Sequence, residues 1–255
     1  MARIALKISY DGTNYNGWQK QIEPQNVCTL QDTIEAVAKK LFKQELKLYA
    51  AGRTDAGVHA YSQVAHFDVQ TAMPIEKMSA ALNGLLSNDI RIIGVAEVDS
   101  SFHARFSPHS KTYRYTVDTA RVQNVFHRLY TAHYPRELDL QLMQKCLHDL
   151  IGEHDFEAFC AANSGRQNFV RTISEAKLWQ DEQLYILELT GNGFLYNMVR
   201  IIVGSLMEIG SGKLAPDILR KALISKKRSD LGVTFGPEGL SLWQLAYAEE
   251  INWKS

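Results

Sequence analysis

One order of apolar patterns, strand-helix-strand-strand-helix-strand, occurs twice along this chain and constrains its fold more than any other feature. In the first half, strands are predicted at residues 4–10, 46–51, 63–69 and 90–98, with helical spacing at 29–41 and 74–86. In the second half, strands are predicted at 112–117, 172–179, 184–189 and 240–246, and helices at 140–150, 195–209 and, as a short addition, 216–224.

We therefore expect an α+β fold with two ferredoxin-like (RRM-like) β-α-β-β-α-β subdomains, at residues 1–106 and 107–255, whose antiparallel sheets join into one extended sheet. The chain has 255 residues and is 45% apolar, so it can bury a sizeable core without disulfides or a structural metal. Local signals agree, because Thr29 and Asp32 predict a helix cap and Asp181-Glu182 predicts a hairpin turn.

The cysteines and the apolar runs indicate a cytoplasmic protein. Cys28, Cys146 and Cys160 are odd in number, widely spaced and without a CxxC pair, which fits a reducing compartment. No run approaches about 20 uninterrupted apolar residues, and the N-terminal segment has no signal-peptide pattern. We expect no membrane association.

Several short motifs resemble cofactor sites but are incomplete. The run at residues 210–213 ends in Gly-Lys, but Met207 replaces the first glycine of a phosphate loop and Leu214 replaces its Ser or Thr. The run at residues 191–193 begins a dinucleotide fingerprint, and Tyr196 replaces its third glycine. His148 and His154 have no metal-site spacing. We therefore expect neither a nucleotide cofactor nor a metal.

The segment Ala51–Ala60, which reads Ala-Gly-Arg-Thr-Asp-Ala-Gly-Val-His-Ala, stands directly after a predicted strand. Two glycines permit unusual backbone angles there, and Arg53 lies two positions before Asp55. A carboxylate beside an arginine stays ionised at neutral pH and can act as a nucleophile or a general base. Alternatively, the aspartate of such a loop only caps backbone N–H groups. The loop by itself leaves both roles open.

Together with four other blocks, this segment resembles the tRNA pseudouridine synthase A family. The other blocks are Tyr10-Asp11-Gly12 with Gly17-Trp18-Gln19, Phe102-His103-Ala104-Arg105-Phe106-Ser107, Lys111-Thr112-Tyr113-Arg114-Tyr115, and Asn197-Met198-Val199-Arg200-Ile201-Ile202-Val203-Gly204. They follow in family order from about residue 4 to residue 247. One departure lies at residues 86–90, where Ser87-Asn88 replaces the usual proline before Asp-Ile.

The resemblance implies an isomerase that converts uridine to pseudouridine at positions 38, 39 and 40 of the tRNA anticodon stem-loop. The N1–C1′ glycosidic bond breaks, the uracil turns in place, and C5 joins C1′. The family uses a catalytic aspartate and neither a cofactor nor a metal. It acts as a homodimer with a central RNA-binding cleft, so tRNA and a second copy of the chain are the expected partners.

The resemblance also assigns roles to four residues. Asp55 matches the catalytic aspartate. Tyr113 matches the active-site tyrosine that stacks on the flipped uracil, although the strand spacing alone does not separate it from Tyr115. Arg200 matches the arginine paired with the aspartate, the alternative being a surface arginine whose charged end reaches water. Arg53 is expected to help flip the base, the alternative being a brace on a loop carbonyl.

The remaining aromatic and histidine side chains receive looser assignments. His59, His103 and Arg105 are expected to build or line the cleft. Phe126, Tyr130 and Tyr134 suit an interface and a core equally well.

The charges sum to zero, from 28 Lys and Arg against 28 Asp and Glu, but they are segregated. Residues 213–228 carry six cations and one anion, and residues 102–128 carry five cations and one anion. Residues 137–157 carry six anions and one cation. We expect the two basic stretches to contact RNA phosphates and the acidic stretch to face solvent elsewhere.

Two other classes of function remain as alternatives. A non-catalytic RNA-binding module would have no need for a carboxylate that repels phosphate, which disfavours it. A small-molecule enzyme on the same frame is disfavoured by the basic stretches and by the incomplete cofactor motifs.

Overall fold

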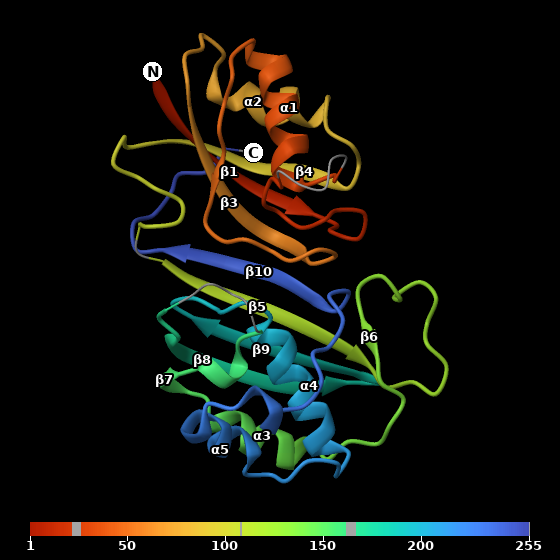
Figure 1. The fold of residues 1–255 in the computed structure, drawn as a ribbon. Coiled ribbons are helices and arrows are strands. Elements are labelled where there is room, and N and C mark those ends of the chain that lie inside the picture. The colour runs from red at the N-terminus through yellow and green to blue at the C-terminus, as the bar shows by residue number, and fades with distance from the viewer. Residues whose placement is uncertain (22–26, 108, 162–166, 255) are drawn as a thin grey trace. The chain divides into compact units, whose positions relative to one another are not determined.

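The computed structural model describes residues 1–21, 27–107, 109–161 and 167–254, and its contacts group the chain into two compact units. Unit 1 comprises Met1–His109 together with Leu242–Ser255, and unit 2 comprises Ser110–Ser241. Figure 1 shows the labelled elements of both units.

Unit 1 carries an antiparallel sheet with two helices. Its strands are β1 (Ala2–Tyr10), β2 (Tyr49–Ala50), β3 (His59–Val69) and β4 (Ile90–Val98), and its helices are α1 (Leu30–Phe42) and α2 (Ile75–Asn83). Strand β1 pairs with both β3 and β4, and the short β2 pairs with the outer side of β3. In chain order this unit reads β-α-β-β-α-β, as the sequence pattern predicts.

Helix α1 shows why these residues form these elements. The Thr29 side chain accepts a hydrogen bond from the Asp32 backbone N at 3.2 Å, and its hydroxyl donates to the Asp32 carboxylate at 2.8 Å. The predicted cap is therefore confirmed. Ile34 and Ala38 repeat at helical spacing and are fully buried, and the helix ends at Lys43, whose φ of 58° is left-handed.

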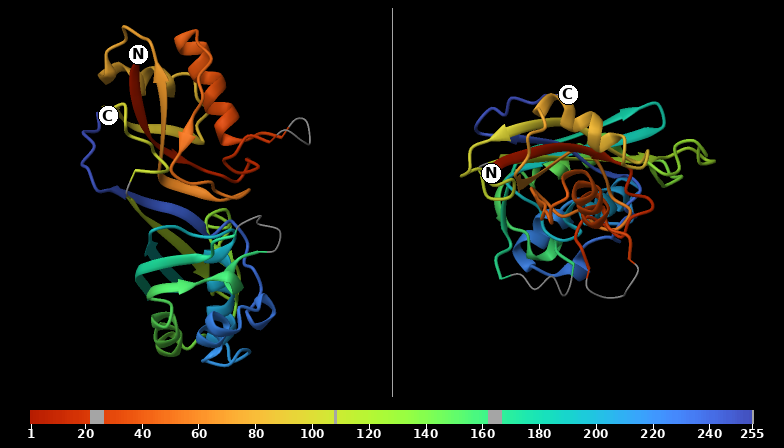
Figure 2. Two further views of the ribbon diagram at one scale, coloured as in Figure 1. Left: turned by 60° about the vertical axis from the view of Figure 1, so that its left-hand side comes forward. Right: turned by 90° about the horizontal axis from the view of Figure 1, so that it is seen from above.

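Unit 2 carries the remaining strands and three helices. The strands are β5 (His109–Asp118), β6 (Ala132–His133), β7 (Gly152–Asp155), β8 (Val170–Asp181) and β9 (Leu184–Gly191). The last strand, β10 (Leu240–Tyr247), begins in this unit, but its residues from Leu242 onward belong to unit 1. The helices are α3 (Leu140–His148), α4 (Met198–Gly210) and α5 (Ile218–Ser225), with 3₁₀ turns at Glu157–Phe159 and Arg228–Asp230. The helices gather on one side of the strands of this unit (Figures 1 and 2), and α4 is the most buried of them.

By hydrogen bonding, the strands of the described residues follow the order β4-β1-β3-β10-β5-β9-β8-β7, with β2 beside β3 and β6 beside β5. This makes a mixed α+β protein with one extended sheet of ten strands within the described part of the chain.

The structure corrects several predicted boundaries. The strand predicted at 46–51 shrinks to Tyr49–Ala50, and the one predicted at 63–69 begins earlier, at His59. The helix predicted from residue 195 begins at Met198, because Asn197 adopts a left-handed φ of 61° that a helix does not continue through. The short β6 and β7 were not predicted, since two to four residues are too few for a periodic pattern.

The end of the chain differs most from the sequence-based division. We expected residues 107–255 to form one subdomain, whereas the contacts place Leu242–Ser255 in unit 1. Tyr247 Oη donates to the carbonyl oxygen of Ala104 at 2.6 Å, and the rings of Trp243 and Tyr61 lie 4.1 Å apart. The backbone of Lys254 forms an isolated bridge with Val95. Such long-range pairing leaves no periodic signal in the sequence.

All three cysteines are free thiols, with Cys28 exposed and Cys146 and Cys160 buried. Within the described residues, no helix combines the length and the apolar character that crossing a bilayer requires.

Replacing Tyr247 by phenylalanine tests whether the C-terminal segment stabilises unit 1. The variant leaves the buried carbonyl of Ala104 without its donor, so we expect Tyr247→Phe to lower the free energy of unfolding by about 1–3 kcal/mol. Chemical denaturation measures it. Tyr196→Phe, which removes the hydroxyl of an exposed tyrosine, is the control and should cost little. Equal effects of the two changes would contradict the prediction.

Candidate active site

The loop at residues 51–58 connects β2 to β3 and is held at its first residues by β3 itself. The backbone N of Ala51 donates to the carbonyl of Val64 at 2.8 Å. The fully buried side chain of Gln63 donates from Nε2 to the carbonyl of Gly52 at 2.9 Å. A side-chain amide thus replaces a sheet hydrogen bond where the chain leaves the strand.

Thr54 anchors the middle of the loop in the core of unit 1. Its hydroxyl shares a 2.8 Å hydrogen bond with Tyr10 Oη, and its carbonyl accepts the backbone N–H of Trp18 at 3.0 Å. Tyr10 is buried, and burial raises the pKa of its phenol far above the ordinary value. The phenol is therefore neutral at neutral pH, and it serves the loop as a hydrogen-bonding group rather than as a base.

Two glycines let the 10–18 segment approach the loop at backbone distance. A Cβ atom on Gly12 would lie 2.0 Å from the carbonyl oxygen of Val58. A Cβ atom on Gly17, whose φ is +84°, would lie 2.7 Å from the carbonyl oxygen of Thr54. The backbone N of Gly57 also donates to the Tyr15 carbonyl at 3.2 Å. The segment Ala51–Ala60 and the segment that carries Gly12 and Gly17, which are separate motifs in the sequence, thus contact each other in the structure.

This contact leaves Arg53 and Asp55 on the open side of the loop. The carbonyl of Asp55 accepts the Val58 backbone N–H at 3.1 Å and closes a turn, and Gly57 in that turn has a φ of +77°. The Asp55 side chain is half-buried, whereas Arg53 is exposed. In the described part of the chain, no hydrogen bond or ion pair holds the Arg53 guanidinium, so a loop-bracing role has no bond to support it.

A second layer of contacts supports the 10–18 segment. The backbone N of Gly12 donates to His59 Nδ1 at 3.0 Å, and Asp11 Oδ1 lies 3.1 Å from the same nitrogen. Tyr15 Oη donates to the Asp89 carboxylate at 3.0 Å, and the backbone N of Asp11 donates to the Asp89 carbonyl at 2.9 Å. The turn at residues 86–90, where the sequence departs from the expected pattern, is therefore connected to the Asp55 loop through the 10–18 segment.

The structure separates the two tyrosines that strand spacing could not. Both lie on the buried face of β5. Tyr115 is fully buried, its hydroxyl donates to the Gly236 carbonyl at 2.7 Å, and burial raises its pKa well above the ordinary value. It is a core residue. Tyr113 keeps a small exposed area, and its ring packs edge-on against Phe194 with centroids 5.1 Å apart.

Arg200 lies in the first turn of α4 and is partly buried. Its Nε donates to the Phe235 carbonyl at 2.6 Å, and its Nη1 donates to Asn197 Oδ1 at 2.8 Å. The left-handed Asn197 at the helix start thus points its amide oxygen at the guanidinium. These two bonds orient the side chain, so it is not the free surface arginine of the alternative interpretation.

The four predicted site residues come from both units. Asp55 and Arg53 belong to unit 1, and Tyr113 and Arg200 belong to unit 2. Their action in one site stays a prediction.

The segregation of charge is partly cancelled by ion pairs. Arg114, counted in the basic stretch 102–128, lies opposite Glu188 in the β5–β9 register and pairs with it at 2.6 Å. Lys226, counted in the stretch 213–228, pairs with Asp155 and lies 3.9 Å from Glu157. Five of the six acids in the stretch 137–157 are exposed, as expected, and the end of that stretch, at Asp155 and Glu157, lies against a basic residue.

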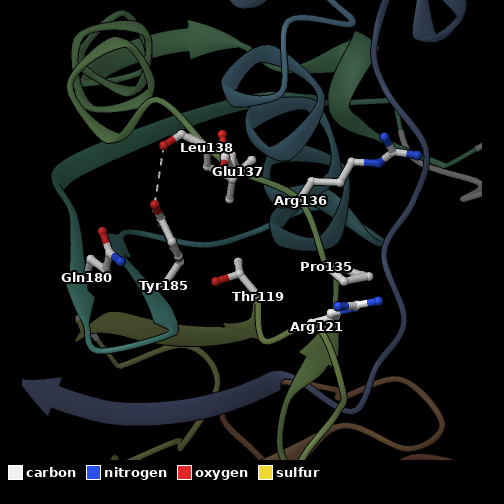
Figure 3. A pocket seen from close by; sticks show the side chains of 8 residues that line it. All are labelled: Thr119, Arg121, Pro135, Arg136, Glu137, Leu138, Gln180 and Tyr185. Carbon is white, nitrogen blue, oxygen red and sulfur yellow. Dashed lines mark hydrogen bonds between the residues drawn. The ribbon is translucent and has the colours of Figure 1, made fainter.

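An open pocket of about 520 Å³ lies in unit 2 at the ends of β5, β8 and β9. Figure 3 shows its lining, which is Thr119, Arg121, Pro135, Arg136, Glu137, Leu138, Gln180 and Tyr185. Tyr185 Oη donates to the Leu138 carbonyl at 3.3 Å. The guanidinium groups of Arg121 and Arg136 extend away from Tyr185 (Figure 3). The pocket contains none of the predicted site residues.

Across the residues that the structure describes, no three His, Cys, Asp or Glu side chains are grouped so that they could hold a metal ion.

Comparison with known proteins decides the family. The family model described as tRNA pseudouridine synthase matches residues 7–107 and 147–248, which include Asp55 and Arg200. The chain belongs to this family. The resemblance carried by the five sequence blocks is thereby confirmed.

The similarity to individual relatives extends over the whole length. A tRNA pseudouridine synthase A of Bacillus pumilus is 45% identical over 247 residues, covering 96% of this chain and 99% of the relative. One from Halalkalibacterium halodurans is 44% identical, covering 94% of this chain and 90% of the relative. Among solved structures, a chain of a Cbf5-Nop10-Gar1 complex covers 92% of this chain and 56% of its own length at 12% identity, but its TM-score of 0.35 is too low to support a conclusion.

The close approach of Gly17 to the loop predicts an unusually costly substitution. Gly17→Ala forces a Cβ against the Thr54 carbonyl, whereas Gly212→Ala meets a similar φ of +76° with nothing within 4 Å. Gly212→Ala should cost about 1 kcal/mol of stability, for the backbone strain alone, and Gly17→Ala about 2–3 kcal/mol more. Urea denaturation of both variants measures the difference. Similar losses of stability in the two variants would show that the loop can shift to accommodate a Cβ atom at residue 17, which would contradict the prediction.

Proposed function

We propose that this chain is a tRNA pseudouridine synthase that isomerises uridine in the anticodon region of tRNA. The near full-length relation to enzymes of that name supports this. The observation that carries it in the structure is the loop of Asp55. Its flanking residues are held by Gln63, Tyr10 and the backbone of the 10–18 segment, while the Arg53 and Asp55 side chains remain at least partly exposed.

The proposed substrate positions are uridines 38, 39 and 40 of the anticodon stem-loop. The reaction breaks the N1–C1′ bond, turns the uracil in place and joins C5 to C1′, and the proton on C5 is lost as N1 gains one. Atoms and electrons balance within the nucleotide, so the isomerisation consumes no co-reactant. The proposed site uses no cofactor.

Each predicted residue has a role that its environment suits. Asp55 supplies an ionised carboxylate near C1′, as a nucleophile or as a base. Arg53, exposed and unpaired in the described chain, helps displace the target base and holds a phosphate. Tyr113 stacks on the displaced uracil. Arg200, oriented by Phe235 and Asn197, pairs with the Asp55 carboxylate.

The same proposal covers the architecture and the location. The β-α-β-β-α-β order of unit 1 supports ferredoxin-like, RRM-like subdomains, and a central cleft would hold the RNA. The three free thiols fit the reducing cytoplasm, where tRNA is modified.

We also propose a homodimer, with the loop at residues 119–131 as its contact surface. The buried Asp118 carboxylate accepts the backbone N–H groups of Ala120 at 2.9 Å and of Asn124 at 3.3 Å, which orders the base of the loop. This ordered loop exposes Val122, Val125, Phe126 and Tyr130, with Phe126 85% exposed. Tyr134, by contrast, is half-buried and packs against Phe235. A second copy is the occupant that the family relation favours.

Replacing the carboxylate of Asp55 tests the proposed chemistry. Asp55→Asn keeps the shape and removes the charge, so pseudouridine formation should fall about a thousandfold or more. Binding of tRNA should be retained, since the lost charge repels phosphate. Carbodiimide-blocked reverse transcription of unmodified tRNA locates the product.

Asp181→Asn, in the exposed β8–β9 turn, is the matched control and should be fully active. A wild-type protein that makes no pseudouridine refutes the isomerase. A fully active Asp55→Asn variant refutes only the assignment of the residue.

A charge on the 119–131 loop tests the homodimer. Phe126→Asp should convert a dimer into a monomer, because a carboxylate buried without a partner in an interface is costly. Ile224→Asp, at an 80% exposed position of α5, should leave the dimer intact. Sedimentation velocity reports the mass. A monomeric wild type would contradict the homodimer, and a dimeric Phe126→Asp would place its interface elsewhere.

A further inference from the structure

Phe106 presents an unusually exposed aromatic ring on unit 1. The residue is 73% exposed, and a guanidinium and an imidazole lie near its ring. The guanidinium of Arg105 lies 5.6 Å from the ring centroid, and the ring of His103 lies 4.5 Å away at an interplanar angle of 36°. A cation and an imidazole therefore border a ring that is mostly exposed to solvent.

A second aromatic ring with its own cation lies beside the first. Tyr49 is 41% exposed, and the ammonium group of Lys47 lies 5.3 Å from its ring centroid. The Tyr49 ring lies 5.5 Å from His103, which thus connects the two rings. We call these five residues, Lys47, Tyr49, His103, Arg105 and Phe106, the aromatic–cation patch.

The patch is ordered by hydrogen bonds of its own turn. The backbone N–H groups of Phe106 and Ser107 both donate to the His103 carbonyl, at 3.0 and 2.8 Å. The Ser107 hydroxyl accepts the His103 backbone N–H at 2.9 Å, and the Arg105 backbone N–H donates to His103 Nδ1 at 3.1 Å. Burial lowers the pKa of His103, so its ring is neutral at neutral pH and suited to stacking. The exposed Phe106 ring is therefore held in place rather than loose.

The patch is built on the same core as the catalytic loop. Ala51, the first residue of that loop, is buried together with Val64 and Ala104, and Phe102 packs against this cluster. Tyr49 precedes Ala51 by two residues, and Ala104 lies within the turn that presents Phe106. Arg3 pairs with Asp68 across the β1–β3 register and donates to the Phe102 carbonyl at 2.9 Å, which ties the turn to the sheet.

We propose that the aromatic–cation patch stacks an unpaired nucleobase of the bound RNA and contacts its phosphate. The proposal rests on the proposed function and adds to it a second base-binding site, apart from the one that receives the target uridine. Exposed rings interleaved with cations are the pattern by which proteins hold single-stranded RNA. The five residues include two permanent cations and no acid, which favours a polyanion over a protein partner.

Removing the ring while keeping its apolar bulk tests the stacking. A fluorescein-labelled, unmodified 17-nucleotide anticodon-arm hairpin is titrated with the full-length protein, and anisotropy gives Kd. Phe106→Leu should raise Kd about 5-fold to 100-fold, the range found when one base loses its aromatic platform. Phe106→Trp, which keeps a stacking ring, should restore binding. Ile93→Ala, which removes an apolar side chain 43% exposed on β4, is the control.

A salt series separates stacking from charge. Phe106→Leu should leave the slope of log Kd against log salt unchanged, whereas Arg105→Ala should reduce it by about 0.7–0.9, as expected for one lost phosphate contact. A structural defect would not divide the two variants in this way.

The outcomes distinguish this proposal from the isomerase itself. A Phe106→Leu variant that binds the hairpin as tightly as the wild type overturns the patch, whatever the enzyme activity, and leaves a protein partner as the candidate occupant. A wild type that fails to bind the hairpin overturns it as well. A wild type that binds but forms no pseudouridine refutes the isomerase, while the ratios of Kd still decide the patch.

Discussion

The conformation of the Asp55 loop depends on a close approach of two backbone segments that leaves no room for a side chain at the contact. Gly12 and Gly17 lie so close to the carbonyls of Val58 and Thr54 that a single added methyl group would overlap them. Main-chain contacts with the 10–18 segment, which continues from β1, thus hold the loop together with the side chains of Gln63 and Tyr10. Small residues in both segments are a steric requirement of one contact.

Around this contact, some polar side chains of unit 1 are buried and support the loop, whereas others are exposed to solvent. Tyr10, Thr54 and Gln63 are buried. Gln63 donates to the loop carbonyl of Gly52, and the Tyr10 hydroxyl bonds to the hydroxyl of Thr54 in the loop. Asp55 and Arg53 stay at least partly open. In unit 2, the Tyr115 hydroxyl is bonded to the Gly236 carbonyl in a fully buried position, whereas Tyr113 is buried to a slightly smaller extent, at 8% exposure. A buried layer of neutral donors and acceptors thus supports the more exposed side chains of the loop.

Charge in this protein acts through local partners. Arg114 and Lys226 count as basic in any sequence window, yet each has an acidic partner brought to it by strand register or by packing. Arg53 is isolated in the sequence from any basic stretch, and it is the cation left exposed beside Asp55. The net charge of a sequence stretch therefore says little about where an anion such as RNA could bind. Cations already paired with an acidic side chain must first be left out of the count.

Local signals made much of the fold predictable. The cap of Thr29, the periodicity of α1 and the glycine-rich loop around Asp55 each depend on neighbours within a few residues. The motif blocks predicted the family, which the comparisons confirm. Three features were beyond this reasoning: the role of Gln63, the burial that distinguishes Tyr115 from Tyr113, and the pairing of the C-terminal segment. Each depends on a contact between residues far apart in sequence, which no local pattern records.

The placement of that segment has a consequence for how the protein is made. Leu245, Tyr247 and Trp253 pack against the cluster that contains Ala51, at the start of the catalytic loop. A ribosome that adds about 5–20 residues each second completes all of unit 2 before it delivers them, a delay on the order of ten seconds. During that time the cluster of Ala51, Val64 and Ala104 in the nascent unit 1 lacks the C-terminal side chains that pack against it. Residues synthesised after unit 2 thus complete unit 1, and a chain released before them carries the Asp55 loop on an uncovered core.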